Sequence, residues 1–319
     1  MSASIQPAKW LRYIESEYLT TFIRDGGAAI KFAVPSDDAL RSELFDGLAN
    51  IGIQAGYLIA KINAVDTKVH MVDEIFFRTA EQIPWDILSR KAIAKLAAES
   101  GYSWVESDDG PLYLQLADAN RVDPQMLLMD LKQAIGNKIF KQHDLSRDFR
   151  VAMTNLCIAE LSGGQDGATT IRVLTEWLTG RNKAVSAVKP VQIFRRINRS
   201  TARYFLESLV RWIRFAGYPG IVILLDAQRV MLACNPHDDG LFYSKAAVLD
   251  SYEVLRQFID SAGQLNGCFV TVVPDMAFLA DQSRGIGAYE ALKFRVFDEI
   301  RDKHLVNPMA SLARISGVV

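Results

Sequence analysis

The stretch that decides the fold is Gly217–Ala227, GYPGIVILLDA, in which a Gly-Tyr-Pro-Gly turn precedes a run of apolar residues. The run from 221 to 225 is short, rich in β-branched side chains and apolar throughout, which predicts a strand buried on both faces of a parallel sheet. It ends at Asp226. Because open α/β sheets bind ligands at the carboxyl ends of their strands, Asp226 is the first candidate for a functional side chain.

An aspartate in this place is also the mark of the Walker B strand of P-loop ATPases, where it helps to hold Mg²⁺. The next residue of such a strand is usually a glutamate that polarises the attacking water. In this chain that residue is Ala227. The stretch therefore has the form of an ATPase strand and lacks one of the residues that hydrolysis needs.

The composition is that of a globular protein with an ample core. The chain has 319 residues, of which 50% are hydrophobic, and its formal net charge is −1, so the overall charge does not favour nucleic acid as a partner. No apolar run approaches the roughly 18–20 residues of a membrane span, and the N-terminus lacks a signal-peptide pattern. Three widely spaced cysteines and four scattered histidines predict reduced thiols, no metal site and a cytoplasmic protein without membrane contact.

Strands and helices alternate at both ends of the predicted structure. Further strands are expected at 28–34, 56–62, 267–273 and 312–319, and helices at 7–25, 39–51, 197–216, 243–262 and 287–302. Between them the expected elements are all helical, at 67–80, 84–100, 112–136, 145–161 and 168–178. These patterns predict an α/β fold with a parallel sheet. Its expected parts are an N-terminal helix with the first βαβ unit (1–66), a helical insertion (67–180) and the rest of the α/β core (181–319).

A phosphate-binding loop of the form G-x-x-x-x-G-K-[ST] should follow the first strand of a P-loop ATPase. Laid on residues 35–42, PSDDALRS, the pattern fails at nearly every position. Pro35 replaces the first glycine, Arg41 replaces the lysine, and only Ser42 fits. The two consecutive aspartates of the stretch would also repel a triphosphate. The competing interpretation is a helix whose first turn is capped by an acid.

Six segments, in the same order along the chain, resemble the BREX-type ATP-binding family of the BrxC/PglY and BrxD kind. They are FIRDGGAAIKFAV (22–34), EWLTG (176–180), INRSTARYFLESLVRWIRFAGYPGIVILLDA (197–227), YEVLRQFID (252–260), RGIGAYEALKFRV (284–296) and NPMASLARI (307–315). The resemblance implies an AAA+-like P-loop ATPase core in a bacterial defence or DNA-modification cluster, with ATP-dependent assembly and work on or near DNA.

The chain departs from this family at the phosphate loop, at Ala227, and after 307–308, where related proteins continue into a C-terminal lid. We therefore expect a P-loop NTPase or AAA+-like sheet with a large helical insertion and no complete lid. The expected function is that of a pseudo-ATPase scaffold or regulatory subunit without a cofactor. Its expected partners are other subunits of a defence complex, an intact P-loop homologue among them, or a second copy of the chain. The degenerate nucleotide site consists of Pro35, Arg41, Ser42, Asp226 and Ala227.

Two alternatives stay open. In the first, Arg41, Ser42 and Asp226 hold ATP and Mg²⁺, and a partner subunit supplies the catalytic acid. In the second, the chain is a DNA-binding module that uses residues 189–214, where seven basic residues face one acid, Glu207. A helix through this stretch would align several of the basic side chains, which could instead meet an acidic partner or solvent. The candidate contacts are Lys189, Arg195, Arg196, Arg199 and Arg203.

Two further signals have competing interpretations. Arg284 and Arg295 lie where an AAA+-like subunit can present an arginine to a neighbour's nucleotide, or they form structural ion pairs with Glu290 or Asp298. Residues 161–165 spell LSGGQ, a signature of ABC-type ATPases, which a Gly-Gly turn before a helix explains equally well.

Overall fold

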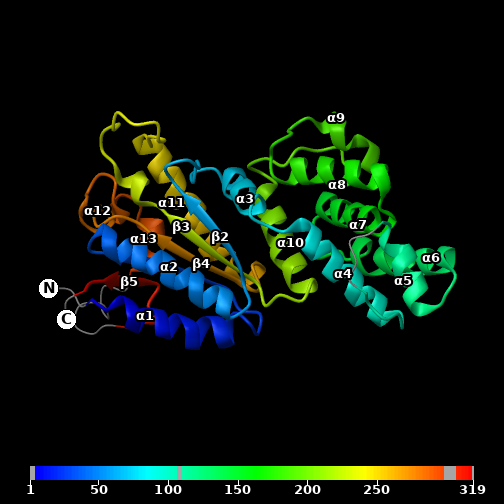
Figure 1. Ribbon diagram of the computed structural model, residues 1–319. Helices are drawn as coiled ribbons and strands as arrows, with labels where there is room; N and C mark the ends of the chain where they lie inside the picture. The colour runs from blue at the N-terminus through cyan, green and yellow to red at the C-terminus, as the bar shows by residue number, and fades with distance from the viewer. Residues whose placement is uncertain (1–3, 106–109, 298–306, 318–319) are drawn as a thin grey trace. The chain divides into compact units, whose positions relative to one another are not determined.

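The computed structural model describes residues 4–105, 110–297 and 307–317, and the chain forms two compact units (Figure 1). The sheet unit combines Met1–Gln82 with Tyr218–Val319, and the helical unit is Ile83–Gly217. The sequence places the ends of the insertion at 67 and 180. In the structure, helix α3 (Val72–Ala80) packs against strand β2 and so belongs to the sheet unit, while the chain beyond 180 continues in the helical unit up to 217.

The strands of the sheet unit all run parallel, in the order β2-β3-β4-β1-β5. They are β1 (Ala29–Pro35), β2 (Leu58–Asn63), β3 (Ile221–Asp226), β4 (Cys268–Val273) and β5 (Leu312–Ile315). Strand β4 therefore separates β1, which leads toward the expected phosphate loop, from β3, which ends at Asp226. The predicted α/β class with a parallel sheet is therefore confirmed.

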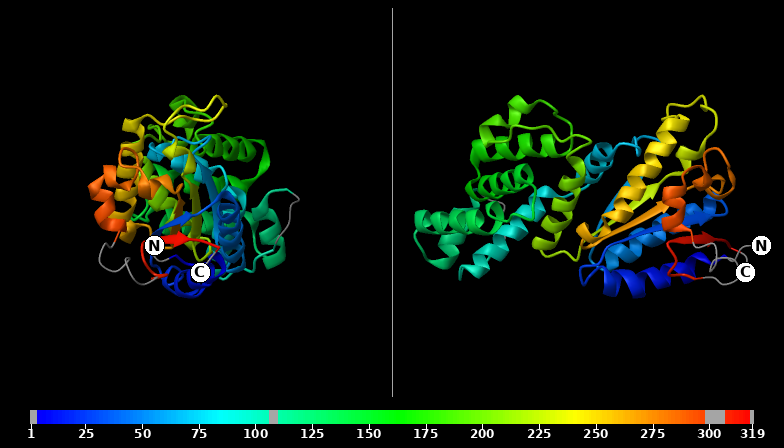
Figure 2. Two further views of the ribbon diagram at one scale, coloured as in Figure 1. Left: turned by 90° about the vertical axis from the view of Figure 1, so that its left-hand side faces the viewer. Right: turned by 180° about the vertical axis from the view of Figure 1, so that it is seen from behind.

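Helices cover both faces of the sheet (Figures 1 and 2). The helices of the first face are α1 (Pro7–Tyr13), its π-helical continuation η1 (Ile14–Phe22) and α2 (Asp38–Gln54). Those of the second face are α11 (Lys245–Asp260), α12 (Ala277–Ala280) and α13 (Glu290–Val296). Alternate residues of β3 supply the two cores: Val222 and Leu224 pack with the first set of helices, and Leu225 faces the second.

The turn before β3 requires glycine. Gly220 has a φ of 155°, and a Cβ on it would lie 1.8 Å from the Gly267 carbonyl oxygen. The amide of Ile221 donates to that same carbonyl (3.0 Å), which starts the β3–β4 ladder. A side chain at 220 would therefore push apart the two central strands that carry Asp226.

Both edges of the sheet are partly closed by groups outside it. At the β2 edge, the Gln82 side chain accepts from the Lys61 amide and donates to the Lys61 carbonyl, each at 2.9 Å. At the β5 edge, the Ile5 amide donates to the Arg314 carbonyl and the Ile5 carbonyl accepts from the Ser316 amide. A side-chain amide and an N-terminal residue thus take the hydrogen-bonding positions that a further strand would use.

The described part of the helical unit packs around helix α7. Its elements are α4 (Trp85–Glu99), α5 (Leu112–Asn120), α6 (Pro124–Ile135), η2 (Gly136–Phe140), α7 (Arg147–Ser162), α8 (Gly164–Leu178), α9 (Val185–Val188), η3 (Lys189–Val191) and α10 (Ala202–Phe215). Phe149 of α7 lies edge-on to Phe205 of α10 at 6.0 Å, and Trp177 of α8 packs on the same Phe205 at 5.5 Å. Buried aromatic contacts of this kind hold α7, α8 and α10 together.

The helices expected over 112–136 and 287–302 differ in the structure. The helix expected over 112–136 is two helices, because Arg121 adopts a left-handed conformation and Asp123 caps a new helix that starts at Pro124. The helix expected over 287–302 is described only as the short α13, and residues 298–302 lie outside the described residues. Within the described ranges, no helix is both long enough and apolar enough to span a bilayer.

Candidate functional site

The connection from β1 to α2 is too short for a phosphate loop. Strand β1 ends at Pro35 and α2 begins at Asp38, so only two residues lie between them. The second of these, Asp37, is the helix N-cap, and its Oδ1 accepts from the Leu40 amide at 2.9 Å. This hydrogen bond lowers the pKa of the Asp37 carboxyl. The predicted acid-capped helix start is therefore confirmed, and a negative charge stands where an ATPase presents free amides to phosphate.

Arg41 is buried, although it replaces a lysine that would reach toward phosphates. Only 8% of its side chain is exposed. Its Nη1 lies 3.3 Å from Asp226 Oδ1 and donates to the Val273 carbonyl at 3.0 Å, and its Nη2 donates to the Pro274 carbonyl at 3.2 Å. The guanidinium thus joins α2 to the carboxyl ends of β3 and β4 and has internal partners for both of its terminal nitrogens.

The Asp226 carboxyl also has its partners within the chain. Its side chain is 18% exposed, and its Oδ1 also accepts from the Gln228 amide at 3.0 Å. Burial raises the pKa of the Asp226 carboxyl, and the hydrogen bond from Gln228 and the charge of Arg41 offset only part of that rise. The oxygen of Asp226 that faces α2 is therefore already bound by two donors of the same chain.

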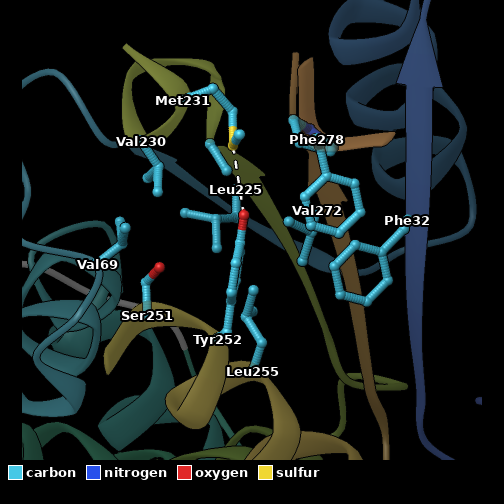
Figure 3. A pocket seen from close by; sticks show the side chains of 12 residues that line it. Phe32, Val69, Leu225, Val230, Met231, Ser251, Tyr252, Leu255, Val272 and Phe278 are labelled. Atoms are coloured by element: carbon cyan, nitrogen blue, oxygen red, sulfur yellow. Dashed lines mark hydrogen bonds between the residues drawn. The ribbon is translucent and has the colours of Figure 1, made fainter. Parts of the chain in front are cut away.

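An apolar cavity, drawn with its lining side chains in Figure 3, borders the residue after Asp226. Ala227 is 7% exposed, and its amide donates to the Val273 carbonyl at 3.0 Å, which extends the β3–β4 ladder by one residue. The cavity around it is lined by Phe32, Leu225, Tyr252, Phe278 and other mostly apolar side chains, and its free space is about 10 Å³. That space is at the lower limit for one water molecule and offers few polar partners for a water. A glutamate here would be buried among aromatic rings.

A second pocket lies on the other side of Asp226, between α2 and the ends of β2 and β3. Its volume is about 410 Å³, and it is lined by Arg41, Ser42, Phe45, Asp46, Lys61, Ile62, Asn63, Arg78 and Asp226. Ser42 is exposed there, and its hydroxyl donates to the Asp38 carbonyl at 3.1 Å. The cations of the lining have acidic neighbours: Lys61 lies 3.9 Å from Asp46, and Arg78 pairs with Asp66 and Glu81. The pocket is polar, and its charges are largely balanced.

Lys61, Asn63 and Arg78 are not among the residues that the sequence singles out. They come from β2 and α3, and they reach the same pocket as α2 only because β2 pairs with β3. No spacing along the chain indicates that these three side chains share a pocket with α2. A search for polar residues at the predicted carboxyl end of the second strand would have found Asn63.

Arg284 and Arg295 occupy different surroundings. Arg284 is 7% exposed, and its Nη2 donates to the carbonyls of Val230 (3.1 Å) and Tyr243 (2.6 Å). Arg295 is exposed and pairs with Asp260 of α11 through both Nε and Nη2. Neither pairs with Glu290 among the described contacts, and Asp298 lies outside the described residues. Both guanidinium groups thus have partners within the sheet unit.

The basic segment lies in the helical unit and is mostly loop. Lys189, Arg195, Arg196 and Arg199 are exposed, while Arg203 is half-buried and lies 3.5 Å from Glu207. A helix that would align the basic side chains at 196, 199 and 203 does not form, because α10 begins only at Ala202. The cause is a turn at Asn198, whose side chain accepts from the Ser200 amide and hydroxyl and whose carbonyl accepts from the Ala202 amide.

The LSGGQ stretch joins two helices. Helix α7 ends at Ser162, Gly163 has a φ of 61°, and α8 begins at Gly164. This is the Gly-Gly turn before a helix that the sequence also allows, and a Cβ on Gly163 would lie 3.0 Å from the Pro111 backbone. The local geometry alone accounts for these glycines.

Comparison with known proteins agrees with the resemblance noted in the sequence. The sequence model of the BREX system ATP-binding protein BrxC/D matches residues 115–318, more than half of the chain. Curated proteins yield no match. A solved structure of the bacterial conjugative coupling protein TrwBdeltaN70, in its unbound monoclinic form, is similar at 10% identity, covering 92% of this chain and 75% of that chain, with a TM-score of 0.25. That similarity is too weak to support an inference.

The match over 115–318 includes most of the helical unit and the strand that ends at Asp226. The chain therefore belongs to the BREX system ATP-binding protein BrxC/D family.

Proposed function

We propose that this chain is a non-catalytic, pseudo-ATPase subunit of a BREX complex, in which it serves as a scaffold or regulator. The observation that carries the proposal is the buried pair of Arg41 and Asp226. In an active P-loop ATPase the carboxylate at the end of this strand helps to hold Mg²⁺. In this chain the guanidinium of Arg41 supplies the compensating positive charge, so the carboxylate is satisfied without metal or nucleotide.

The phosphate site and the site of the catalytic acid support the same proposal. A triphosphate at the start of α2 would meet the charged carboxyl of Asp37 instead of free amides. The position that would polarise water is Ala227, which faces an apolar cavity. Three features that argue against ATP hydrolysis therefore lie close together, at the start of α2 and at the end of β3.

Calorimetry with ATP and Mg²⁺ tests the proposal most directly. We expect no binding heat for the wild-type chain or for Asp226→Ala, with circular dichroism confirming that the variant is folded. Micromolar binding by the wild type that is lost in Asp226→Ala would overturn the proposal, because it would show that residues 35–42 form an unrecognised phosphate site.

The partners that fit this role are other subunits of the BREX system, an intact P-loop homologue among them, or a second copy of this chain. A scaffold needs its folded surface and not its nucleotide site. Co-purification with candidate subunits, followed by light scattering, should therefore give the same stoichiometry with and without ATP. Assembly that requires ATP bound to this chain would contradict a purely non-catalytic role.

The second candidate function is an atypical ATPase completed by a partner subunit. The pocket of about 410 Å³ beside Ser42 and Asp226 favours it, because that space is open to a ligand. Nucleotide binding there would require Arg41 to leave Asp226 and the two carbonyls that it now binds. Hydrolysis that appears only when a partner is added, and that Ser42→Ala in this chain abolishes, would support this candidate over the scaffold.

The basic segment favours a further role, contact with nucleic acid. Lys189, Arg195 and Arg196 are exposed, and no ion pair joins them to the described residues. Cations of this kind bind phosphates with a strong dependence on salt. Duplex binding that weakens with salt and that Arg195→Glu with Arg196→Glu abolishes would support the contact, and binding unchanged by that double substitution would exclude the segment as its cause.

A further inference from the structure

The chain from Arg181 to Leu206 carries seven lysines and arginines and no acid. Two aromatic residues lie among these cations with unusually exposed side chains: Phe194 is 56% exposed and Tyr204 is 51% exposed. Most of the aromatic rings around them are buried, as for Trp177 and Phe205. Rings that remain in water beside arginines are the combination found where proteins stack the bases of nucleic acid.

The loop that carries Phe194 is anchored by its backbone and by the residues on either side. Ile193 and Ile197 are buried, at 0% and 6% exposure. The Trp177 indole N–H donates to the Arg195 carbonyl at 3.3 Å. These anchors fix the loop while the side chains of residues 194–196 face solvent, so Phe194 is held outside the core by the fold around it.

Tyr204 is connected to that loop through the residues beside it. The guanidinium of Arg203 lies over the Tyr204 ring, 5.2 Å from its centroid. Trp177, which binds the Arg195 carbonyl, also packs against Phe205, the residue that follows Tyr204. One buried side chain therefore connects the loop to the start of α10 and brings the two exposed rings to the same region of the helical unit.

We propose that this aromatic–arginine surface, formed by Phe194, Arg195, Arg196, Arg203 and Tyr204, binds single-stranded nucleic acid. The proposal deepens the nucleic-acid contact proposed above, on which it rests. The arginines bind phosphates, and the two rings stack on unpaired bases. Bases within a duplex are already stacked on one another and are unavailable to Phe194 and Tyr204. The surface therefore prefers a single strand over a duplex of the same length.

Fluorescence anisotropy on the intact chain tests the preference, with labelled oligo(dT) and oligo(rU) of about 16 nucleotides and a duplex of equal length. We expect a single strand to bind more tightly than the duplex, and the two oligonucleotides distinguish DNA from RNA. Phe194→Ala and Tyr204→Ala should each weaken single-strand binding by roughly fivefold or more, with a much smaller effect on the duplex. Phe194→Trp should retain binding.

The matched control for the ring deletions is Phe140→Ala, which removes a ring of similar exposure (48%) in the same unit. The matched control for the charge reversal is Lys132→Glu with Lys141→Glu, which changes exposed charges on and just after the α6–η2 stretch. Neither should alter binding, and thermal melting should show that every variant is folded. If Arg195→Glu with Arg196→Glu abolishes binding while both ring deletions have no effect, the nucleic-acid contact stands and base stacking is overturned. Binding to poly-glutamate with none to any nucleic acid would overturn both, and would identify a docking surface for an acidic protein.

Discussion

Nη1 of Arg41 lies 3.3 Å from Oδ1 of Asp226, and this contact joins two positions that are 185 residues apart in the sequence. In the ATPase pattern, one position belongs to the residue that neutralises phosphate and the other to the residue that helps to hold Mg²⁺. In this chain they neutralise each other. The site is held together by its own side chains, and the pair has become part of the core of the sheet unit.

Replacement of Arg41 should therefore destabilise the protein instead of opening a binding site. Arg41→Ala leaves Asp226 buried without its cation, removes the donor of the Pro274 carbonyl, and leaves the Val273 carbonyl with the Ala227 amide alone. We expect a loss of about 3 kcal/mol in the free energy of unfolding, measured by urea denaturation. The double variant Arg41→Ala with Asp226→Ala should lose less than the two single losses added together, because both partners of one interaction are removed.

The matched control for this experiment is Arg78→Ala. Arg78 lines the same pocket and pairs with Asp66 and Glu81, but 41% of its side chain is exposed. Exposed ion pairs contribute about 1 kcal/mol or less. Equal losses for Arg41→Ala and Arg78→Ala would show that the burial of the Arg41 pair has no energetic consequence.

Restoring the missing glutamate should not restore hydrolysis. Ala227→Glu places a carboxyl in a cavity lined by Phe32, Tyr252 and Phe278, where the free space is about 10 Å³. We expect a destabilisation of about 3 kcal/mol or more and no release of phosphate from ATP. A folded variant that hydrolyses ATP would mean that the other parts of the active site are intact, contrary to the proposed function.

Acid should weaken the contact between α11 and the segment before α13. Hydrogen bonds from Arg256 lower the pKa of Glu253 to about 2, and Tyr289 donates to the same carboxyl. A carboxyl whose pKa is lower in the folded state stabilises the protein above its ordinary value of 4.5, and that contribution is lost as the pH falls toward 2. Glu253→Gln should lower stability at neutral pH and flatten this acid-induced loss, as measured by urea midpoints across the interval.

Asp226 should give the opposite pH dependence. Burial raises the pKa of its carboxyl above the ordinary 3.8, so the folded state binds a proton that the unfolded state releases. The contribution of Asp226 to stability then falls as the pH rises from 3.8 through the higher pKa of the folded state. Asp226→Asn should remove this decrease in stability above pH 3.8, and Glu253→Gln should leave it unchanged. A wild-type profile that rises throughout this pH range and is unaffected by Asp226→Asn would contradict the role of burial.

Substitutions of the two candidate trans-acting arginines should lower the stability of the protein by different amounts. Arg284 binds the carbonyls of Val230 and Tyr243 inside the sheet unit, and Arg284→Met should cost about 2 kcal/mol of unfolding free energy. Arg295→Met removes a partly exposed pair with Asp260 and should cost about 1 kcal/mol or less. If Arg284→Met is as stable as the wild type but reduces the ATPase rate of an added partner, a trans-acting role replaces the structural one.

Local patterns in the sequence were enough to place most of the secondary structure. The run before Asp226 is a strand, and the acid at position 37 caps α2, because both depend on neighbouring residues. The strand order in the sheet could not be predicted, because the two early strands β1 and β2 are not neighbours. Instead β3 and β4, from the last third of the chain, lie between them, and no local pattern encodes that order. The start of α10 was missed because the side chain of Asn198 forms a competing turn.

The candidate site was less predictable than the strands that carry it. Arg41 and Ser42 were singled out because they align with a known pattern, but the alignment says nothing about burial. The pairing of Arg41 with Asp226 depends on β4 separating β1 from β3, which brings α2 over the ends of β3 and β4. The carbonyl partners of Arg284 could not be predicted either. Every residue has a backbone carbonyl, and the sequence does not show which of them a side chain will bind.

The partly closed edges of the sheet restrict how a partner can bind to this chain. Gln82 occupies the Lys61 backbone on one side, and Ile5 pairs with the Arg314 backbone on the other. A partner therefore cannot lengthen the sheet at these positions without first displacing groups of the chain itself. A partner must instead bind to side chains on the helices and loops. Its specificity can therefore change through substitutions of these side chains while the backbone stays unchanged. Related chains can in this way keep the same framework and still bind different partners.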